Sequence, residues 1–260
     1  NIMTGNQTIL EIKNICKAFG GVQALLDIEF YLKKASITAL IGPNGAGKTT
    51  LFNLITGIFP PDSGQIRFEG RPIKDLAVHQ RVKAGIARTF QNVELFESMS
   101  VLENILVGLH TRTRAGMAAS ILRLGRTRRE EKKARKRAME LLEFVGLQDH
   151  AHNKSSDLPF GWQRLVELAR ALAAQPGLLL LDEPAAGLNI SETGRLGELI
   201  LQIRKQGITI LLVEHDMSLT MSISDHIIVL DQGKKIAEGP PRQIQSNDAV
   251  MAAYLGKGKN

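Results

Sequence analysis

The feature that most constrains this chain is a glycine-rich segment of eight residues, GPNGAGKT, at positions 42–49. It matches the pattern G-x-x-x-x-G-K-[S/T] and follows an apolar run at 37–41 that is typical of a buried strand. After it, Leu51, Leu54 and Ile55 have the spacing of a buried helix face. A strand, a glycine-rich loop and a helix in this order direct backbone N–H groups and a helix N-terminus toward an anion. The sequence therefore predicts a phosphate-binding loop.

The residues of this loop have separate expected tasks. The glycines let the backbone curl around phosphate oxygens. We expect Lys48 to neutralise the β- and γ-phosphates of a nucleotide and Thr49 to offer its hydroxyl to Mg²⁺. A glycine-rich turn without a ligand is the alternative, and the flanking strand and helix count against it. The candidate phosphate-binding residues are Gly42, Asn44, Gly45, Gly47, Lys48, Thr49 and Thr50.

Two hydrophobic patterns predict two kinds of sheet. Continuous apolar runs at 37–41, 178–181, 208–213 and 227–230 indicate strands covered on both faces, as in a parallel sheet. Alternation of apolar and polar residues indicates half-buried antiparallel strands; the apolar members are Leu26, Ile28, Phe30, Leu32, Ile66 and Phe68. The predicted fold is therefore an α/β core with an antiparallel β subdomain and an inserted helical subdomain.

Polar side chains follow two of the continuous apolar runs. Asp182 and Glu183 come directly after 178–181, and His215 comes two residues after 208–213. Carboxyl ends of parallel strands meet at one edge of a sheet, so we expect these groups on the rim that carries the phosphate loop. There Asp182 can serve the Mg²⁺ shell, Glu183 can orient an attacking water, and His215 can hydrogen-bond the γ-phosphate. The alternatives are a solvated turn for the carboxylates and a structural role for the histidine.

Five segments resemble the nucleotide-binding subunits of ATP-binding-cassette (ABC) transporters. In chain order they are GPNGAGKTT, RTFQN, LPFGWQRLVELARAL, LLLLDEPAAGLN and LLVEHD. The resemblance covers nearly the whole chain, and it is closest to the ATPases of branched-chain amino acid importers, on the further segments GGVQALLDI, ARTFQNVELFESMSVLENILVG and MAAYLG. It implies a P-loop NTPase core of the ABC ATPase type.

The resemblance also implies roles for residues outside the phosphate loop. Phe19 takes the position of the aromatic that stacks on adenine, with a core phenylalanine as the alternative. Gln91 takes the position of the loop glutamine, which reaches Mg²⁺ and the attacking water and links the core to the helical lobe. The magnesium, general-base and switch-histidine roles fall on Asp182, Glu183 and His215.

The family's signature motif, usually LSGGQ, reads LPFGW at 158–162. In the family its serine contacts the γ-phosphate bound to a partner subunit, and here that position is Pro159, which lacks both a hydroxyl and a backbone N–H. Gly161 and the following helix N-terminus remain as anion donors. A second departure is Asn189, where many cassettes have aspartate.

The expected domains are a catalytic core with the antiparallel subdomain at 1–91 and 166–260, and a helical subdomain with the signature at 92–165. The helical subdomain contains a basic insertion at 111–137, with eleven basic and two acidic residues. A helix over 129–145, ended by Gly146, is predicted to carry the basic residues on its outer face. The insertion is either a solvated surface or, with the apolar residues Met117, Ile121, Leu122 and Leu124, a site for anionic headgroups or a permease loop.

The sequence therefore predicts an ATP-binding and ATP-hydrolysing subunit of an importer, using ATP and Mg²⁺. The expected partners are integral-membrane permease subunits, a second identical or similar ATP-binding subunit and, indirectly, an external solute-binding protein. No apolar run approaches the roughly 18 residues that span a bilayer and the N-terminus lacks a secretion signal, so we expect a peripheral protein on the cytoplasmic face of the inner membrane.

Several alternatives remain open from the sequence. Branched-chain amino acids are the expected solute, and other amino acids, amides or urea are alternatives. A nucleic-acid-associated cassette is disfavoured because the basic run lacks interleaved aromatics for base stacking, so no nucleic-acid partner is expected. A P-loop kinase or GTPase leaves the segment LPFGWQRLVELARAL unexplained.

Overall fold

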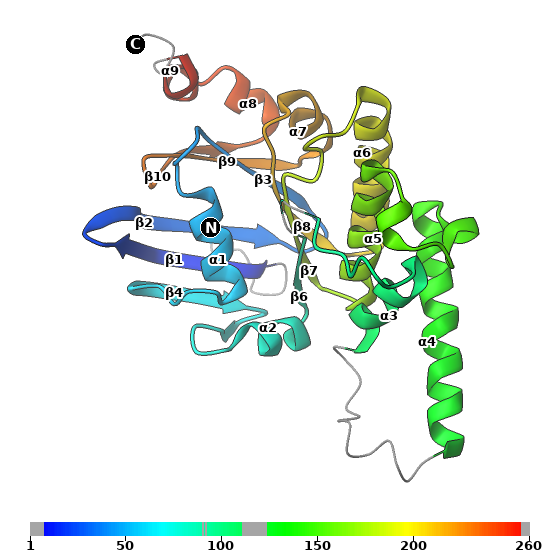
Figure 1. The fold of residues 1–260 in the computed structure, drawn as a ribbon. Coiled ribbons are helices and arrows are strands. Elements are labelled where there is room, and N and C mark those ends of the chain that lie inside the picture. The colour runs from blue at the N-terminus through cyan, green and yellow to red at the C-terminus, as the bar shows by residue number, and fades with distance from the viewer. Residues whose placement is uncertain (1–7, 90, 92, 111–123, 256–260) are drawn as a thin grey trace.

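The computed structural model describes residues 8–89, 91, 93–110 and 124–255. This part of the chain forms a four-stranded antiparallel sheet and a six-stranded sheet, with helices between them and on the far side of the larger sheet (Figure 1). The α/β fold with an antiparallel subdomain and an inserted helical lobe is confirmed.

The antiparallel sheet has the strand order β2-β1-β4-β5. Its strands are β1 (Thr8–Phe19), β2 (Val22–Lys33), β4 (Ser63–Phe68) and β5 (Arg71–Pro72). The expectation that Leu26 shares the buried face of β2 with Ile28 is wrong, because Leu25 is buried and Leu26 is 40% exposed. Asp27 adopts a left-handed conformation with φ 52°, which marks a bulge that breaks the alternation.

The six-stranded sheet has the order β10-β9-β3-β8-β7-β6. Its strands are β3 (Ile37–Ile41), β6 (Ile86–Arg88), β7 (Leu178–Asp182), β8 (Thr209–Val213), β9 (His226–Asp231) and β10 (Lys234–Gly239). All neighbours are parallel except the pair β9 and β10. Along β7, Leu178 and Leu180 pack in one core and Leu179 and Leu181 in another, so the continuous apolar run is buried on both faces as predicted.

Helices fill both sides of the larger sheet. The helix α1 (Lys48–Thr56) packs between the two sheets through Leu51, Phe52, Leu54 and Ile55. In the described part of the chain, the core on the other side of the larger sheet is formed by five helices: α3 (Val101–His110), α4 (Leu124–Val145), α5 (Phe160–Ala173), α6 (Ile190–Lys205) and α7 (Met217–Ile223). The remaining helices are α2 (Val78–Ala84), α8 (Pro241–Gln245), α9 (Asp248–Leu255) and two short 3₁₀ turns, Gln148–His150 and Ser155–Asp157.

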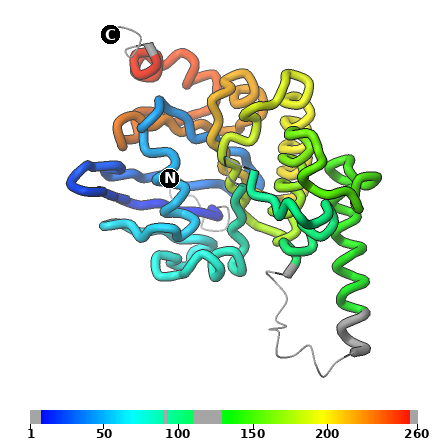
Figure 2. The backbone as a smooth tube through the Cα atoms, viewed as in Figure 1, coloured from blue at the N-terminus to red at the C-terminus, as the bar shows by residue number. Residues whose placement is uncertain are grey.

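The chain leaves the core after β6, runs through α3 and α4, and returns along α5 (Figure 2). Helix α5 is continuous across the expected boundary between 165 and 166, so one rigid element belongs to both the lobe and the core. The division of the chain at 92–165 stays a proposal. Within the described residues, no helix combines the length and the apolarity needed to cross a membrane.

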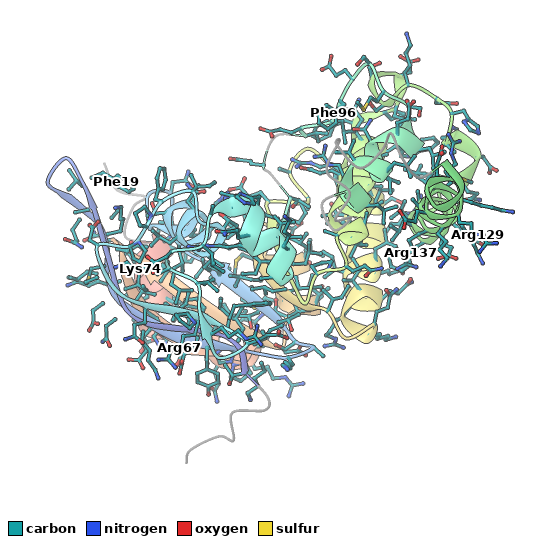
Figure 3. All side chains as sticks on the ribbon, turned by 90° about the horizontal axis from the view of Figure 1, so that it is seen from below. Phe19, Arg67, Lys74, Phe96, Arg129 and Arg137 are labelled. Carbon is teal, nitrogen blue, oxygen red and sulfur yellow. The ribbon has the colours of Figure 1, made fainter. Side chains whose placement is uncertain are left out.

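Helix α4 confirms the predicted amphipathic pattern and begins five residues earlier than expected. Ala138, Leu141, Leu142 and Val145 are buried, and the helix ends before Gly146, which has φ 73°. Basic side chains from 129 onward lie at the surface, where Figure 3 shows Arg129 and Arg137. The apolar residues Met117, Ile121 and Leu122 of the basic insertion lie outside the described residues.

Candidate active site

The glycine-rich segment connects β3 to α1, as the sequence predicts. Gly47 has φ 103°, and a Cβ atom there would lie 2.6 Å from Leu25 Cδ2. A Cβ atom on Gly42 would collide with the Leu230 carbonyl oxygen. Glycine is therefore required at both positions by the close approach of neighbouring strands, in addition to the backbone curvature of a phosphate loop.

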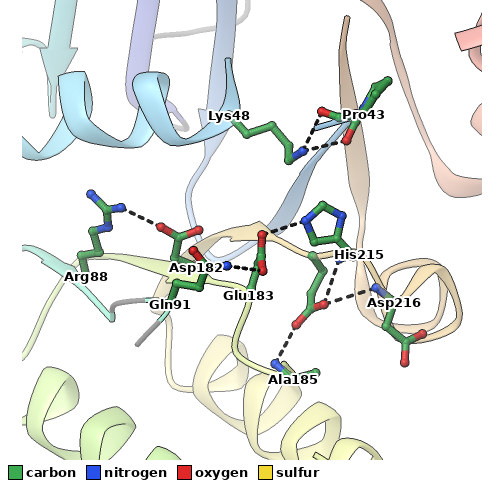
Figure 4. A network of polar contacts seen from close by, with 11 residues as sticks. Pro43, Lys48, Arg88, Gln91, Asp182, Glu183, Ala185, His215 and Asp216 are labelled. Atoms are coloured by element: carbon green, nitrogen blue, oxygen red, sulfur yellow. Dashed lines mark hydrogen bonds and ion pairs between the residues drawn. The ribbon is translucent and has the colours of Figure 1, made fainter. Parts of the chain in front are cut away.

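Lys48 lies inside this loop. Its Nζ donates hydrogen bonds to the carbonyl oxygens of Gly42 at 2.7 Å and Pro43 at 3.1 Å, and its side chain is buried (Figure 4). The loop borders a cavity of about 640 Å³. The cavity is lined by Ala24, Asn44, Gly45, Ala46, Gly47, Lys48, Thr49, Thr50, Gln91, Glu183 and His215. Residues from five separate parts of the sequence thus face one cavity.

The Glu183 carboxylate is held from two sides in this cavity. Nε2 of His215 lies 2.7 Å from Glu183 Oε1, a distance at which an imidazole N–H donates to a carboxylate. Gln91 Nε2 donates to Glu183 Oε2 at 2.9 Å. Glu183 also has φ 48°, a strained left-handed conformation for a non-glycine residue. Glu183 and His215 lie on the rim that carries the phosphate loop, as the strand pattern predicts, and Gln91 lies beside them.

The loop that carries Gln91 is tied to the helical lobe. Arg164 of α5 donates from Nη2 to the Gln91 carbonyl oxygen at 2.5 Å. The same guanidinium lies 5.2 Å from the centre of the Phe160 ring, in the first turn of α5. Gln91 therefore has one contact to Glu183 on the rim of the cavity and one to α5, whose first turn contains part of the signature segment.

Asp182, which the strand pattern predicts on the same rim, is buried at the end of β7 and does not line the cavity. Its Oδ2 forms an ion pair with Arg88 Nη2 at 2.6 Å, and both side chains are less than one-tenth exposed. Arg88 Nη1 also donates to Asn53 Oδ1 of α1 at 2.6 Å. Arg88 was not predicted as a site residue. The signal for it in the sequence is a charged residue at the end of the short strand β6, which pairs with the strand that carries Asp182.

Glu214 is a second residue that the sequence analysis missed. Its side chain is buried directly after β8, and burial raises the pKa of this carboxyl group, although three backbone hydrogen bonds act in the opposite direction. The feature of the sequence that could have identified it is its position between an apolar strand and His215. Asn189, noted for departing from the family, caps α6: its side chain accepts from the Glu192 N–H at 3.0 Å.

Phe19, Pro159 and Gly161 do not line the cavity. Phe19 lies near the tip of the β1–β2 hairpin and is 42% exposed, so the alternative of a core phenylalanine is wrong (Figure 3). Its ring packs edge-on against Phe59, with 5.4 Å between the ring centres. Pro159 is the exposed N-cap of α5. Gly161 is buried, and a Cβ atom there would lie 2.6 Å from Glu192 Oε1. Pro159 and Gly161 of the signature segment therefore make no part of the cavity beside their own chain's phosphate loop.

The donors near the cavity suit a hard divalent cation. A hydroxyl from Thr49, an amide from Gln91 and the Asp182 carboxylate supply the oxygen ligands that Mg²⁺ prefers. Asp182 already pairs one oxygen with Arg88. The residues present therefore fit the cation by their chemistry.

A phosphate loop that faces a carboxylate held by histidine and glutamine is suited to nucleoside triphosphate hydrolysis. With the antiparallel sheet and the helical lobe, it defines an ATP-binding cassette ATPase. The sequence pattern of the ABC transporter family matches residues 25–186, and that of the branched-chain amino acid ATP-binding cassette transporter matches 234–260. The chain belongs to the ABC transporter family, which rules out the P-loop kinase and GTPase alternatives.

Curated relatives match over almost the full length. The chain is 44% identical over 253 residues to the high-affinity branched-chain amino acid transport ATP-binding protein LivG of Escherichia coli K12, covering 97% of this chain and 99% of LivG. It is 43% identical, with the same coverage, to the corresponding protein BraF of Pseudomonas aeruginosa.

Solved structures of cassettes have the same fold. An ATP-binding cassette of an ABC transporter in its ADP conformation has a TM-score of 0.85 and 32% identity, covering 97% of this chain and 100% of that one. A dimeric cassette in a post-hydrolysis state, bound to ADP and Pi, has a TM-score of 0.76 and 27% identity, covering 90% and 99%.

Proposed function

We propose that this chain is the ATP-hydrolysing subunit of an importer for branched-chain amino acids. The observation that carries the hydrolytic part is the Glu183 carboxylate, held by His215 and Gln91 across one cavity from the phosphate loop. The solute is inferred from the near-full-length similarity to LivG and BraF, whose names state branched-chain amino acid transport.

In the proposed reaction Glu183 accepts a proton from water as the water oxygen attacks the γ-phosphorus. The bond from that phosphorus to the bridging oxygen breaks, and ADP leaves with the bonding electron pair. Lys48 and the loop N–H groups hold the β- and γ-phosphates, and His215 and Gln91 keep the Glu183 carboxylate in line with the water. The strained backbone of Glu183 fixes the direction of its side chain.

Thr49, Gln91 and Asp182 are the residues that would hold Mg²⁺. When bound, the cation neutralises charge on the β- and γ-phosphate oxygens. Arg88 is the neighbour of Asp182 in this arrangement and fixes the orientation of its carboxylate.

The remaining predicted residues belong, in our proposal, to a sandwich of two ATP-binding subunits. Because Pro159 and Gly161 lie off the cavity of their own chain, the segment that contains them would contact the nucleotide of a second subunit, with the N–H groups of Phe160 and Gly161 at the start of α5 as donors. Phe19, exposed at the hairpin, would stack on adenine. The second subunit is either another copy or a similar cassette.

We further propose that the dimer binds integral-membrane permease subunits on the cytoplasmic face of the inner membrane. An external solute-binding protein would act through the permease, and the chain would bind no nucleic acid. The basic face of α4 would remain at the surface of this assembly.

The experiment is purification of the assembled transporter through a tag on this chain, followed by uptake in vesicles. Leucine, isoleucine and valine should accumulate in an ATP-dependent manner, while a complex with Glu183→Gln should bind ATP without uptake. Accumulation of an amide or urea in preference to leucine would contradict the proposed solute and leave the hydrolytic assignment in place.

A further inference from the structure

Glu214 connects two loops of the active site from below. The side chain is 4% exposed and is not part of the cavity lining. Its Oε1 accepts a hydrogen bond from the Ala185 N–H at 2.7 Å. Its Oε2 accepts from the N–H groups of His215 at 3.0 Å and Asp216 at 3.3 Å (Figure 4). One carboxylate thus holds the backbone of both loops.

These loops carry the two partners of the catalytic contact. Ala185 lies two residues after Glu183, and the other two N–H groups belong to His215 itself and to its neighbour. Between these two loops, Nε2 of His215 lies 2.7 Å from Oε1 of Glu183. A shift of either loop would therefore change that distance unless the loops move together.

The chemistry of the site requires a carboxylate. The three groups that hydrogen-bond to Glu214 are backbone N–H donors, and they approach both of its oxygens. A carboxylate accepts on both sides, whereas an amide accepts on one side and presents an N–H to a donor on the other. Burial of a charged group is unfavourable unless it is hydrogen-bonded, and these three donors supply that compensation.

We propose that Glu214 is a positioning residue that clamps the His215 loop to the loop that follows Glu183. The clamp sets the contact between His215 and Glu183 and transmits movement of the 185–189 loop to the histidine. The proposal rests on the hydrolytic roles proposed above for these two residues.

The test uses Glu214→Gln in the assembled transporter, measuring kcat, nucleotide affinity and amide hydrogen exchange. The amide can hold one loop only, so exchange should become faster in one of the peptides that contain Ala185 or His215. We expect kcat to fall by about 10- to 100-fold, as for loss of one charge-assisted hydrogen bond, with nucleotide affinity unchanged. Glu214→Asp, which keeps two acceptor oxygens, should retain more activity than Glu214→Gln.

Asp225→Asn is a control for the loss of a carboxylate that accepts a backbone N–H; Asp225 is half-exposed and also pairs with Arg204. Asp225 also accepts a backbone N–H, from Ile37 at 2.8 Å, but at the opposite end of β3 from the phosphate loop. Its substitution should lower thermal stability and leave kcat unchanged. A similar fall in kcat for Asp225→Asn and Glu214→Gln would reduce the role of Glu214 to general stability and overturn the proposal.

A double variant separates the clamp from the hydrolytic assignment. If Glu214 acts through His215, Glu214→Gln should lower kcat little further once His215→Ala is present. An equal fall in both backgrounds, or unchanged exchange of the Ala185 and His215 peptides, would overturn the clamp. Full activity of His215→Ala would instead overturn the role proposed for the histidine, while the exchange measurement still tests whether Glu214 ties the loops.

Discussion

Arg88→Met should destabilise this protein in a way that Mg²⁺ with nucleotide partly reverses. The substitution removes the guanidinium that pairs with Asp182 at 2.6 Å and binds Asn53, and it keeps an apolar stem near the Phe52 ring. Both charged side chains of the pair are less than one-tenth exposed, so the variant leaves the Asp182 carboxylate buried without its cation.

The size of the effect follows from that burial. Removing one partner of a buried ion pair costs about 3–5 kcal/mol, because the remaining charge stays desolvated. For a chain of this length, each kcal/mol lowers the melting temperature by about 2–4 °C, so the expected fall is about 6–20 °C. The matched control is Arg137→Met on α4, whose pair with Glu140 is more than 40% exposed and is worth about 1 kcal/mol or less.

The assay is thermal unfolding followed by circular dichroism and by fluorescence of Trp162, the single tryptophan of the chain. A divalent cation near Asp182 replaces the lost positive charge, so MgADP should raise the melting temperature of Arg88→Met more than that of the wild type. ADP with a chelator should stabilise both equally. A variant that melts within about 2 °C of the wild type, or an equal gain from MgADP, would refute this account of the pair.

Three further predictions follow from the cavity, the signature and a half-buried histidine. Lys48→Ala should abolish tight MgATP binding in calorimetry, because Lys48 is the sole lysine or arginine among the described residues that line the cavity. Pro159→Ser should raise steady-state phosphate release about tenfold by adding a hydroxyl donor. Equal rates for the variant and the wild type would show that the missing hydroxyl does not affect hydrolysis. Burial lowers the pKa of His226 below 6.5, so the folded state binds fewer protons than the unfolded chain and stability falls as the pH drops through about 6.5. The free energy of unfolding should therefore change less between about pH 7.5 and 5.5 in His226→Asn than in the wild type. An equal pH dependence in the two proteins would show that His226 is not the group responsible.

The parts of the fold that the sequence predicts are those with local signals. Continuous apolar runs became the central strands because each is covered on both faces, and the loop at 42–49 needed only its own residues and two flanking elements. The exposed side of Leu26 could not be predicted, because the bulge at Asp27 depends on pairing with β1.

The active site shows the same division. Glu183 and His215 follow strands, so the topology of a parallel sheet already places them on one rim. The partners of Asp182 and Glu214 are set by tertiary packing: Arg88 lies 94 residues before Asp182, and Ala185 lies 29 residues before Glu214. The position of the signature segment off the cavity also emerges only from the assembled lobe.

The most direct test of the central claim is single-turnover phosphate release from MgATP by Glu183→Gln in the assembled transporter. The substitution keeps the size of the side chain and removes the proton acceptor. It should bind MgATP as tightly as the wild type and release phosphate about 10²- to 10⁴-fold more slowly, as expected for loss of a general base. Glu198→Gln, at an exposed position of α6, is the control and should leave the rate unchanged. Phosphate release by Glu183→Gln at the wild-type rate would contradict the assignment of this carboxylate as the base.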